Sequence, residues 1–183
     1  MIYHPTSLAD ALLAEPEIHG DERGSFARTM CRAEFAEHGI VGEFVQQNSS
    51  VSVHAGTIRG MHFQLAPHTE GKFVRCIRGA ILDVIVDLRR SSPSFMRHEG
   101  FELSAQNHRM LWVPPGFAHS FQSLSDDTEV TYLVTAAYAP DAERGLRYDD
   151  PRLAIDWPLP VTTISAKDAA WPLLGPDQPD FFD

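Results

Sequence analysis

The chain has 183 residues, which suits one domain able to bury a substantial apolar core. Its formal charge of -10, from 15 Lys and Arg against 25 Asp and Glu, argues against a long nucleic-acid partner. There is no basic leader before an apolar stretch and no apolar run long enough to span a bilayer, so we expect a cytoplasmic protein outside membranes. Cys31 and Cys76 lie far apart and match neither a disulfide framework nor a zinc site.

The predicted elements are mainly short strands. A helix is expected near residues 30–38, with Gly39 suited to the position after its end. Strand-like runs separated by turns follow at 57–64, 73–77, 81–88, 110–113, 120–124 and 130–135. Their density predicts a sandwich or barrel. We therefore expect one domain over residues 1–183, with an amino-terminal arm at about 1–45, a barrel at about 46–138 and a carboxy-terminal wrap at 139–183.

The run at 81–88 is apolar on nearly both faces, as expected for a central strand covered on each side. Asp83 within it needs a partner. Two interpretations stay open: a structural carboxylate tied to backbone or arginine, or a group that orients a pocket histidine such as His119.

Two motifs indicate a pocket inside the barrel. Gly56 followed by His62, and Pro114-Pro-Gly-Phe-Ala-His119, resemble the two motifs of the cupin superfamily, whose barrels usually hold a metal through three histidines and a glutamate. Gln64 stands where the second histidine is expected, and Lys72 where the glutamate is expected. An ammonium in place of a carboxylate repels a divalent cation. We therefore expect a metal-free pocket, no cofactor, and an all-β fold: a cupin-like double-stranded β-helix, or jelly-roll barrel, with short peripheral helices.

Several side chains of this predicted unit suit an anionic ligand and proton transfer. Alternation puts His62 and Gln64 on one face of their strand. The same predicted unit gathers cationic groups in an acidic protein: Arg59, His62, Lys72 and His119. Tyr132 could be a core aromatic or a proton donor opposite a histidine.

Ser165 and Asp168 have the spacing of a capping box, and spacing alone favours that structural interpretation. The alternative is that Asp168 reaches a histidine and holds one tautomer of its ring.

Together these segments resemble the dTDP-4-dehydrorhamnose 3,5-epimerase family over about residues 21–174. The residues that carry the resemblance are 21–24, 47–48, 59–64, 71–76, 83–87, 113–119, 132, 138–140, 149–151 and 165–168. The resemblance implies a homodimer with exchanged amino-terminal strands that acts on a nucleotide-diphosphate 4-keto-6-deoxyhexose without metal or organic cofactor. The product would be dTDP-4-dehydrorhamnose, a precursor in deoxysugar and polysaccharide biosynthesis.

The resemblance also implies roles for single residues. His62 would be the general base, Asp168 its orienting partner, Tyr132 the general acid and Lys72 the group that stabilises the enolate. Substrate-contacting positions would be Arg23, Phe26, Arg28, Gln47, Asn48, Arg59, His119, Tyr138, Glu143 and Lys167. Phe26 and Tyr138 would flank the nucleoside.

Two positions depart from the family pattern: Arg28, where a glutamate is typical, and Leu133, where lysine is common. Three alternatives remain at this point: an epimerase of C3 alone or C5 alone, a metal-dependent cupin such as a dioxygenase, and a sugar-nucleotide binding module without turnover.

Overall fold

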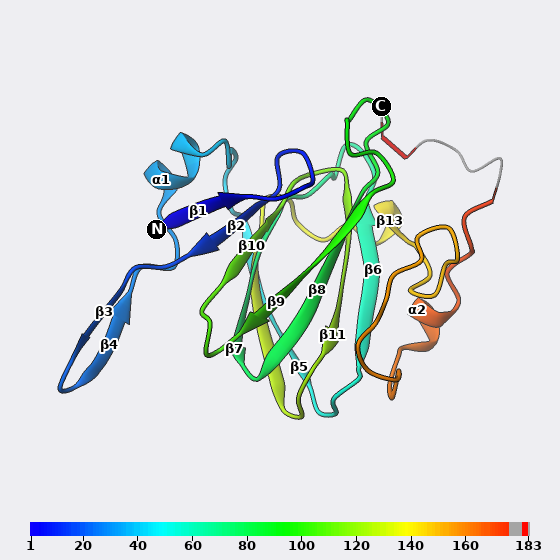
Figure 1. Ribbon diagram of the computed structural model, residues 1–183. Helices are drawn as coiled ribbons and strands as arrows, with labels where there is room; N and C mark the ends of the chain where they lie inside the picture. Colours follow the sequence, from blue (N-terminus) through cyan, green and yellow to red (C-terminus); the bar gives the residue numbers. More distant parts are fainter. Residues whose placement is uncertain (176–180, 183) are drawn as a thin grey trace.

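The computed structural model describes residues 1–175 and 181–182. Within this part of the chain, the strands form a six-stranded sheet, a five-stranded sheet and a separate two-stranded hairpin. Figure 1 shows the two larger sheets packed face to face as a flattened barrel. The all-β barrel with short peripheral helices expected from the sequence is confirmed.

The six-stranded sheet joins the amino-terminal strands to the barrel. Its order is β1 (Ile2–Pro5), β2 (Leu12–Glu15), β10 (Met110–Val113), β7 (Lys72–Arg78), β12 (Thr128–Val134) and β5 (Gln46–Ser52). All pairings in this sheet are antiparallel. Strands β1 and β2 did not stand out in the sequence, because both are four residues long and lack a clear apolar alternation.

The five-stranded sheet carries the two histidine motifs. Its order is β13 (Glu143–Gly145), β6 (Ile58–Gln64), β11 (Phe117–Ser123), β8 (Ala80–Asp87) and β9 (His98–Ser104). The predicted central strand is β8, which pairs with β11 on one side and β9 on the other. Strand β9 was not predicted.

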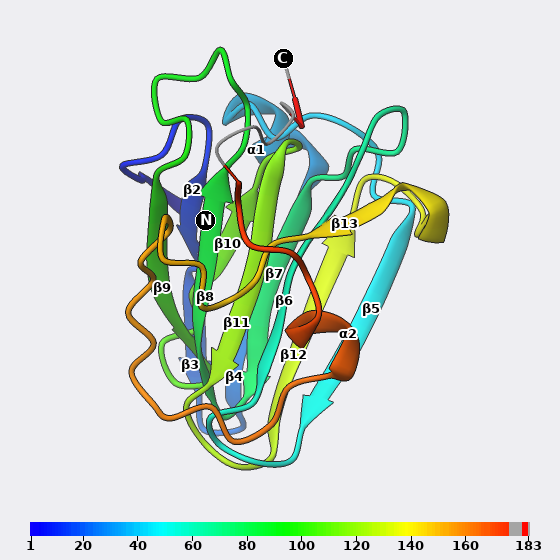
Figure 2. The same ribbon diagram turned by 90° about the vertical axis from the view of Figure 1, so that its right-hand side faces the viewer.

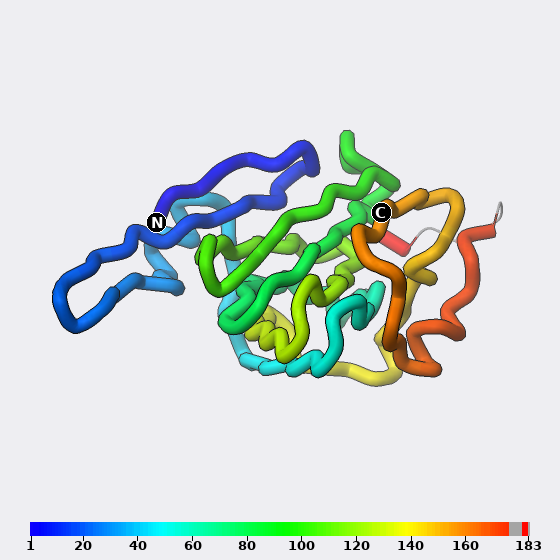
Figure 3. Tube along the Cα trace, turned by 60° about the horizontal axis from the view of Figure 1, so that its bottom comes forward, coloured from blue at the N-terminus to red at the C-terminus, as the bar shows by residue number. Residues whose placement is uncertain are grey.

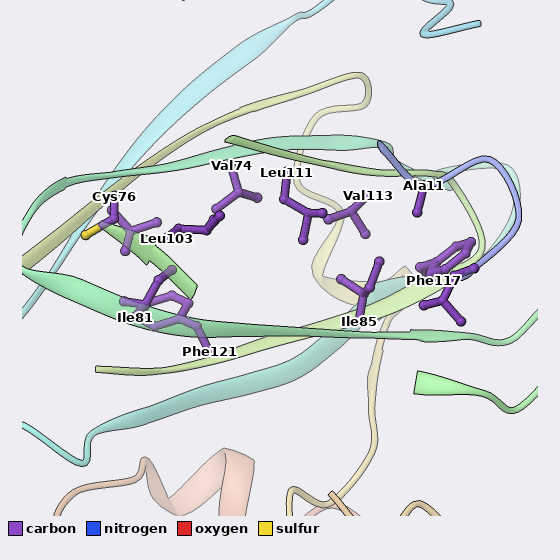
Figure 4. Packing of buried hydrophobic residues seen from close by; sticks show 12 residues of the cluster. Ala11, Val74, Cys76, Ile81, Ile85, Leu103, Leu111, Val113, Phe117 and Phe121 are labelled. Carbon is purple, nitrogen blue, oxygen red and sulfur yellow. The ribbon is translucent and has the colours of Figure 1, made fainter. Parts of the chain in front are cut away.

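Between the two sheets lies the main apolar core (Figure 4). Val74 and Leu111 project from the six-stranded sheet toward Ile81 and Ile85 of the five-stranded sheet. Each of these four side chains is fully buried. The polar site described below lies next to this core, because Phe121 and Tyr132 contact both.

The hairpin of β3 (Ile18–Asp21) and β4 (Gly24–Ala27) extends away from the barrel (Figures 1 and 3). It is followed by helix α1 (Arg32–Glu37), which confirms the helix predicted near 30–38. Gly39 follows the helix with φ of +76°, a left-handed conformation that glycine adopts without steric cost. Phe35 of α1 is buried against Phe73 on the outer face of the six-stranded sheet.

After β12 the chain wraps over the five-stranded sheet, as Figure 2 shows. This segment contains a 3₁₀ helix, Pro140–Ala142, then β13 and helix α2 (Ala166–Ala169). Phe63 of β6 packs beneath it against Leu146, Phe181 and Phe182. No helix in the described residues is long and apolar enough to cross a membrane. Cys31 and Cys76 are both free thiols.

Candidate active site

Two adjoining cavities open between the sheets and share three side chains: His62, Lys72 and Tyr132. The first, of about 260 Å³, is called the amide cavity here because it also contacts Gln46, Asn48 and Gln64. The second, of about 270 Å³, is called the cationic cavity because Arg59, His119 and Lys167 lie in its wall. The shared side chains therefore occupy the centre of one continuous polar site.

His62 lies on β6 and is held by a carboxylate from the carboxy-terminal segment. Its Nε2 is 2.5 Å from Oδ1 of Asp168, which is buried. Burial alone would raise the pKa of Asp168, but the hydrogen bond and charge of His62 outweigh it and lower that pKa. The carboxylate thus stays ionised, favours the imidazole proton on Nε2 and leaves Nδ1 free to accept a proton.

Both interpretations of the Ser165–Asp168 spacing are correct. Ser165 is the N-cap of α2, and its side chain accepts a hydrogen bond of 3.0 Å from the backbone nitrogen of Asp168. The carboxylate of the same residue remains available for His62, and it also accepts from the backbone nitrogen of Gly60 at 3.2 Å. The cap therefore fixes the short helix that delivers the carboxylate, which lies beside β6 in Figure 2.

A second histidine and carboxylate lie next to the first pair. His119 of β11 is the register partner of His62 across the sheet. Its Nε2 lies 2.9 Å from Oδ1 and 3.0 Å from Oδ2 of Asp83. Of the two interpretations of Asp83, the structure supports the one in which it orients a pocket histidine.

Lys72 comes from the opposite sheet, at the start of β7. Its Nζ lies 3.1 Å from Oε1 of Glu70, and both side chains are largely buried. The ammonium therefore keeps a fixed carboxylate partner while it faces both cavities.

Tyr132 of β12 faces the same space as Lys72. Burial, with a contribution from the charge of Glu70, raises the pKa of its phenol. Asn48 on β5 stands opposite Tyr132 in the register. Strands β6 and β12 belong to different sheets. The imidazole of His62 and the protonated phenol of Tyr132 therefore face the cavities from opposite walls.

Three side chains meet where β13, α2 and the segment after β12 come together. Glu143 contacts Nζ of Lys167, and the hydroxyl of Tyr138 donates to Glu143 at 2.7 Å. Burial would raise the pKa of Glu143, but hydrogen bonds from Lys167 and Tyr138 outweigh it and lower that pKa. Strand β12 ends at Val134, so Tyr138 reaches the amide cavity from a loop and not by strand alternation.

Gln64 has a structural role at this edge of the site. Its Nε2 donates to the carbonyls of His68 and Ala137, at 3.0 and 3.3 Å, and its Oε1 accepts from the backbone nitrogen of Ala139 at 2.6 Å. The amide therefore fixes the loop that carries Tyr138. Among the described residues, no group of three or more His, Cys, Asp and Glu side chains could hold a metal ion.

Arg23, Phe26 and Arg28 are not brought to the site of their own chain. They lie on or just after the β3–β4 hairpin, and none of them lines either cavity. Phe26 is 71% exposed. Arg23 pairs with Asp21, and Arg28, the first departure from the family pattern, pairs with Glu34 at 2.7 Å.

Gln47 is also kept out of the site, by strand alternation. Gln46 and Asn48 of β5 line the amide cavity, whereas Gln47 between them is exposed on the other face. Leu133, the second departure, faces that outer side of the sheet too and packs beside Phe35.

Sequence reasoning missed three polar residues of the cavity walls: Gln46, Ser50 and Glu70. The sequence did contain a signal for Glu70, which precedes Lys72 by two positions. A lysine at the start of an apolar strand needs an opposite charge nearby, and Glu70 supplies one. For Gln46 and Ser50 no signal existed, because both faces of β5 are polar.

Comparison with known proteins gives one consistent result. The family model described as dTDP-4-dehydrorhamnose 3,5-epimerase matches residues 5–175. A protein of that name from Sinorhizobium fredii (strain NBRC 101917 / NGR234) is 43% identical over 175 residues, which cover 95% of this chain and 90% of the relative.

Solved structures agree with this result. The dTDP-4-dehydrorhamnose 3,5-epimerase of Bacillus anthracis str. Ames, with TDP and PPi bound, has a TM-score of 0.92 at 44% identity and covers 94% of this chain and 99% of its own. A dTDP-6-deoxy-D-glucose-3,5-epimerase from Legionella pneumophila Philadelphia 1, in complex with dTDP-4-keto-L-rhamnose, has a TM-score of 0.89 at 42% identity and covers 94% and 92%. This chain therefore belongs to the dTDP-4-dehydrorhamnose 3,5-epimerase family.

Proposed function

We propose that this protein is a dTDP-4-dehydrorhamnose 3,5-epimerase, which inverts C3 and C5 of dTDP-4-keto-6-deoxyglucose. One observation carries the proposal: His62, Lys72 and Tyr132 line both cavities and come from facing sheets. An imidazole, an ammonium and a phenol around one space are the three groups that epimerisation beside a ketone requires.

His62 removes the proton. The C4 ketone makes the hydrogens on C3 and C5 acidic, because the carbanion delocalises onto the carbonyl oxygen. Asp168 supports the base, since its ionised carboxylate stabilises the imidazolium that forms.

Lys72 stabilises the enolate. Its largely buried ammonium meets the negative charge that develops on the C4 oxygen. Glu70 fixes the direction of the ammonium group by its contact at 3.1 Å.

Tyr132 returns the proton on the other face of the sugar. Inversion requires that the proton leave on one face and arrive on the other, which two facing walls provide. The raised pKa keeps the phenol protonated at neutral pH, so it is available as a donor.

The cationic cavity is the proposed place for the charged part of the substrate. Arg59 and Lys167 line it, and guanidinium groups bind phosphate oxygens through paired hydrogen bonds. The guanidinium of Arg59 is already directed by Ser52, at 3.2 Å, and by the carbonyl of Val51, at 2.8 Å. Tyr138 would then lie against the nucleoside.

A homodimer is part of the proposal. Arg23 and Phe26 lie on a hairpin that projects from the barrel, and Phe26 is largely exposed. Both residues would complete the site of a second copy, with Phe26 facing the nucleoside. The cytoplasmic location expected from the sequence remains a prediction.

Deuterium exchange tests the function directly. The protein is incubated with dTDP-4-keto-6-deoxyglucose in D₂O, and NMR follows deuterium at each carbon. Exchange at C3 and C5 with formation of dTDP-4-dehydrorhamnose is the expected result. Exchange at one carbon identifies a monoepimerase, binding without exchange identifies a binding module, and activity that depends on a stoichiometric metal identifies a metal-dependent cupin.

Two variants assign the roles. His62→Asn should abolish exchange, whereas Tyr132→Phe should permit proton removal and block inversion. His54→Asn is the matched control, because His54 is exposed and lines neither cavity. Exchange in His62→Asn at the parent rate would show that another group is the base.

A further inference from the structure

The inward face of β5 is a row of polar side chains: Gln46, Asn48, Ser50 and Ser52. Three of them have partners. Gln46 donates to Asn48 at 2.8 Å, and Ser52 accepts from Nε of Arg59 at 3.2 Å. Ser50 differs, because its Oγ is buried and has no hydrogen-bond partner among the described residues.

A buried hydroxyl without a partner is unfavourable, since it gives up hydrogen bonds to water and gains none in return. Such a group is rare in a folded protein and needs an explanation. Ser50 lines the cationic cavity together with His62, Lys72 and Tyr132. Ser50, whose hydroxyl is buried and unused, therefore borders the space in which the reacting sugar is proposed to lie.

We infer that Ser50 recognises the C2 hydroxyl of the hexose and so helps to determine which sugar the enzyme accepts. The inference rests on the proposed function, because it takes the ligand to be a hexose bound between His62 and Tyr132. A serine hydroxyl donates one hydrogen bond and accepts others, which matches a sugar hydroxyl with the same capacities.

The choice of C2 follows from the reaction. C3 and C5 change configuration during turnover, so a hydroxyl on C3 changes direction relative to the protein. The C2 carbon keeps its configuration. A rigid strand such as β5 can hold one hydrogen bond to the C2 hydroxyl through both inversions, and this bond would keep the ring in place while C3 is inverted.

The test removes the Ser50 hydroxyl and, separately, the hydroxyl on the substrate. For Ser50→Ala, kcat/KM with dTDP-4-keto-6-deoxyglucose should fall about tenfold, the worth of one hydrogen bond in a dry site. With the 2-deoxy analogue, Ser50→Ala and the parent should differ less than about twofold, because the partner is already missing. An equal loss with both substrates, or no loss with either, would overturn the inference.

Ser49→Ala is the matched control. Ser49 lies on the same strand, but its side chain is on the exposed face and donates to Glu129 at 2.8 Å. This variant makes the same atomic change without reaching the cavity. It should retain parent kinetics with both substrates.

A binding measurement separates this inference from the proposed function. Calorimetric titration with dTDP-glucose and dTDP-2-deoxyglucose needs no turnover. Ser50→Ala should weaken the affinity for dTDP-glucose about tenfold and leave the affinity for dTDP-2-deoxyglucose unchanged. This result is expected even if the parent catalysed no exchange. Affinity for dTDP, which has no hexose, should be unchanged in the variant.

Thermal unfolding excludes a merely structural role. Because the hydroxyl of Ser50 has no protein partner among the described residues, Ser50→Ala should unfold at or above the parent temperature. A clear loss of thermal stability, together with equal kinetic losses for both sugars, would identify Ser50 as a packing residue.

Discussion

Replacing Asp168 by asparagine should remove a charge from the site while changing its shape little. The asparagine side chain has nearly the same volume, and its carbonyl oxygen can still accept a hydrogen bond from Nε2 of His62. The backbone hydrogen bond from the nitrogen of residue 168 to Ser165 does not involve the carboxylate, so α2 should keep its cap. The variant therefore removes the charge of the carboxylate, together with the acceptor that Oδ2 provides for the backbone nitrogen of Gly60.

The expected size of the effect follows from the short contact. Nε2 and Oδ1 are 2.5 Å apart, and the charge of an imidazolium is spread over its ring. With charge centres about 4 Å apart and an effective dielectric constant of about 20, the attraction is about 4 kcal/mol. This attraction is gained only when His62 accepts the substrate proton, so its loss raises the barrier and slows the reaction about 10³-fold.

The assay is the initial rate of deuterium incorporation at C3 and C5, measured for the parent and for Asp168→Asn. Asp149→Asn is the control, since it makes the same chemical change at an exposed carboxylate paired with Arg147. Circular dichroism should be the same for all three proteins. A loss smaller than about tenfold in Asp168→Asn would refute the electrostatic argument, because a 2.5 Å ionic contact would then contribute almost nothing.

Three further variants test other parts of the structure. Lys72→Met keeps the length of the side chain and removes the ammonium, so the exchange rate should fall about 10²–10³-fold with substrate affinity changed much less; a loss below tenfold would contradict the role of Lys72 as enolate stabiliser. Gly145→Ala would place a Cβ 2.3 Å from the Trp171 ring and 2.6 Å from the carbonyl oxygen of Met61, so urea unfolding should show a loss of about 1–3 kcal/mol, and activity should also fall because α2 lies just before Trp171. If Gly145→Ala kept the stability and activity of the parent, the Trp171 ring could move away from the added methyl group at no cost, and the prediction would be wrong. Asp87 is buried, and although burial raises its pKa, hydrogen bonds from Arg89, Ser92 and Ser94 outweigh this and lower the pKa. Its contribution to stability is thus complete above the unfolded-state pKa of about 4 and is lost as pH falls through the lower folded-state value. Asp87→Asn should cost about 2–3 kcal/mol at pH 7 and flatten the loss of stability below pH 4, as measured by urea unfolding at several pH values; an unchanged pH dependence would exclude Asp87 as its source.

The sequence was sufficient for the barrel and for the centre of the site. Strands with an apolar face, such as β8 and β10, were found because their side chains enter the core. Alternation separated His62 from Met61 and Phe63 but left open which face is inward. In the structure Met61 and Phe63 pack against the carboxy-terminal segment, whereas His62 lines the cavities.

On β5 the same reasoning failed. The sequence Gln46-Gln-Asn-Ser-Ser-Val-Ser52 is polar at almost every position, so neither set of alternating side chains is marked as inward. The family resemblance, and not strand alternation, placed Gln47 and Asn48 at the site; of these Asn48 lines the amide cavity, beside Gln46. The inward set is decided by pairing with β12, which places Asn48 opposite Tyr132.

The projecting hairpin shows a different limit. Arg23 and Phe26 were expected at the site because of a family resemblance, which assigns roles but not the chain that supplies them. Periodicity could not find β3 and β4 either, because almost all their side chains are exposed and carry no apolar pattern.

Gln64 opposes the construction of a metal site in this barrel. Its amide stands where a cupin metal site usually has a histidine. The amide nitrogen donates to the backbone carbonyls of His68 and Ala137, and the amide oxygen accepts from the backbone nitrogen of Ala139. Restoring an imidazole at this position would supply one ligand and at the same time release the loop that holds Tyr138, while Lys72 would still repel the ion. Building a metal site in this pocket therefore requires changes at position 64, at Lys72 and in the loop before Tyr138 together.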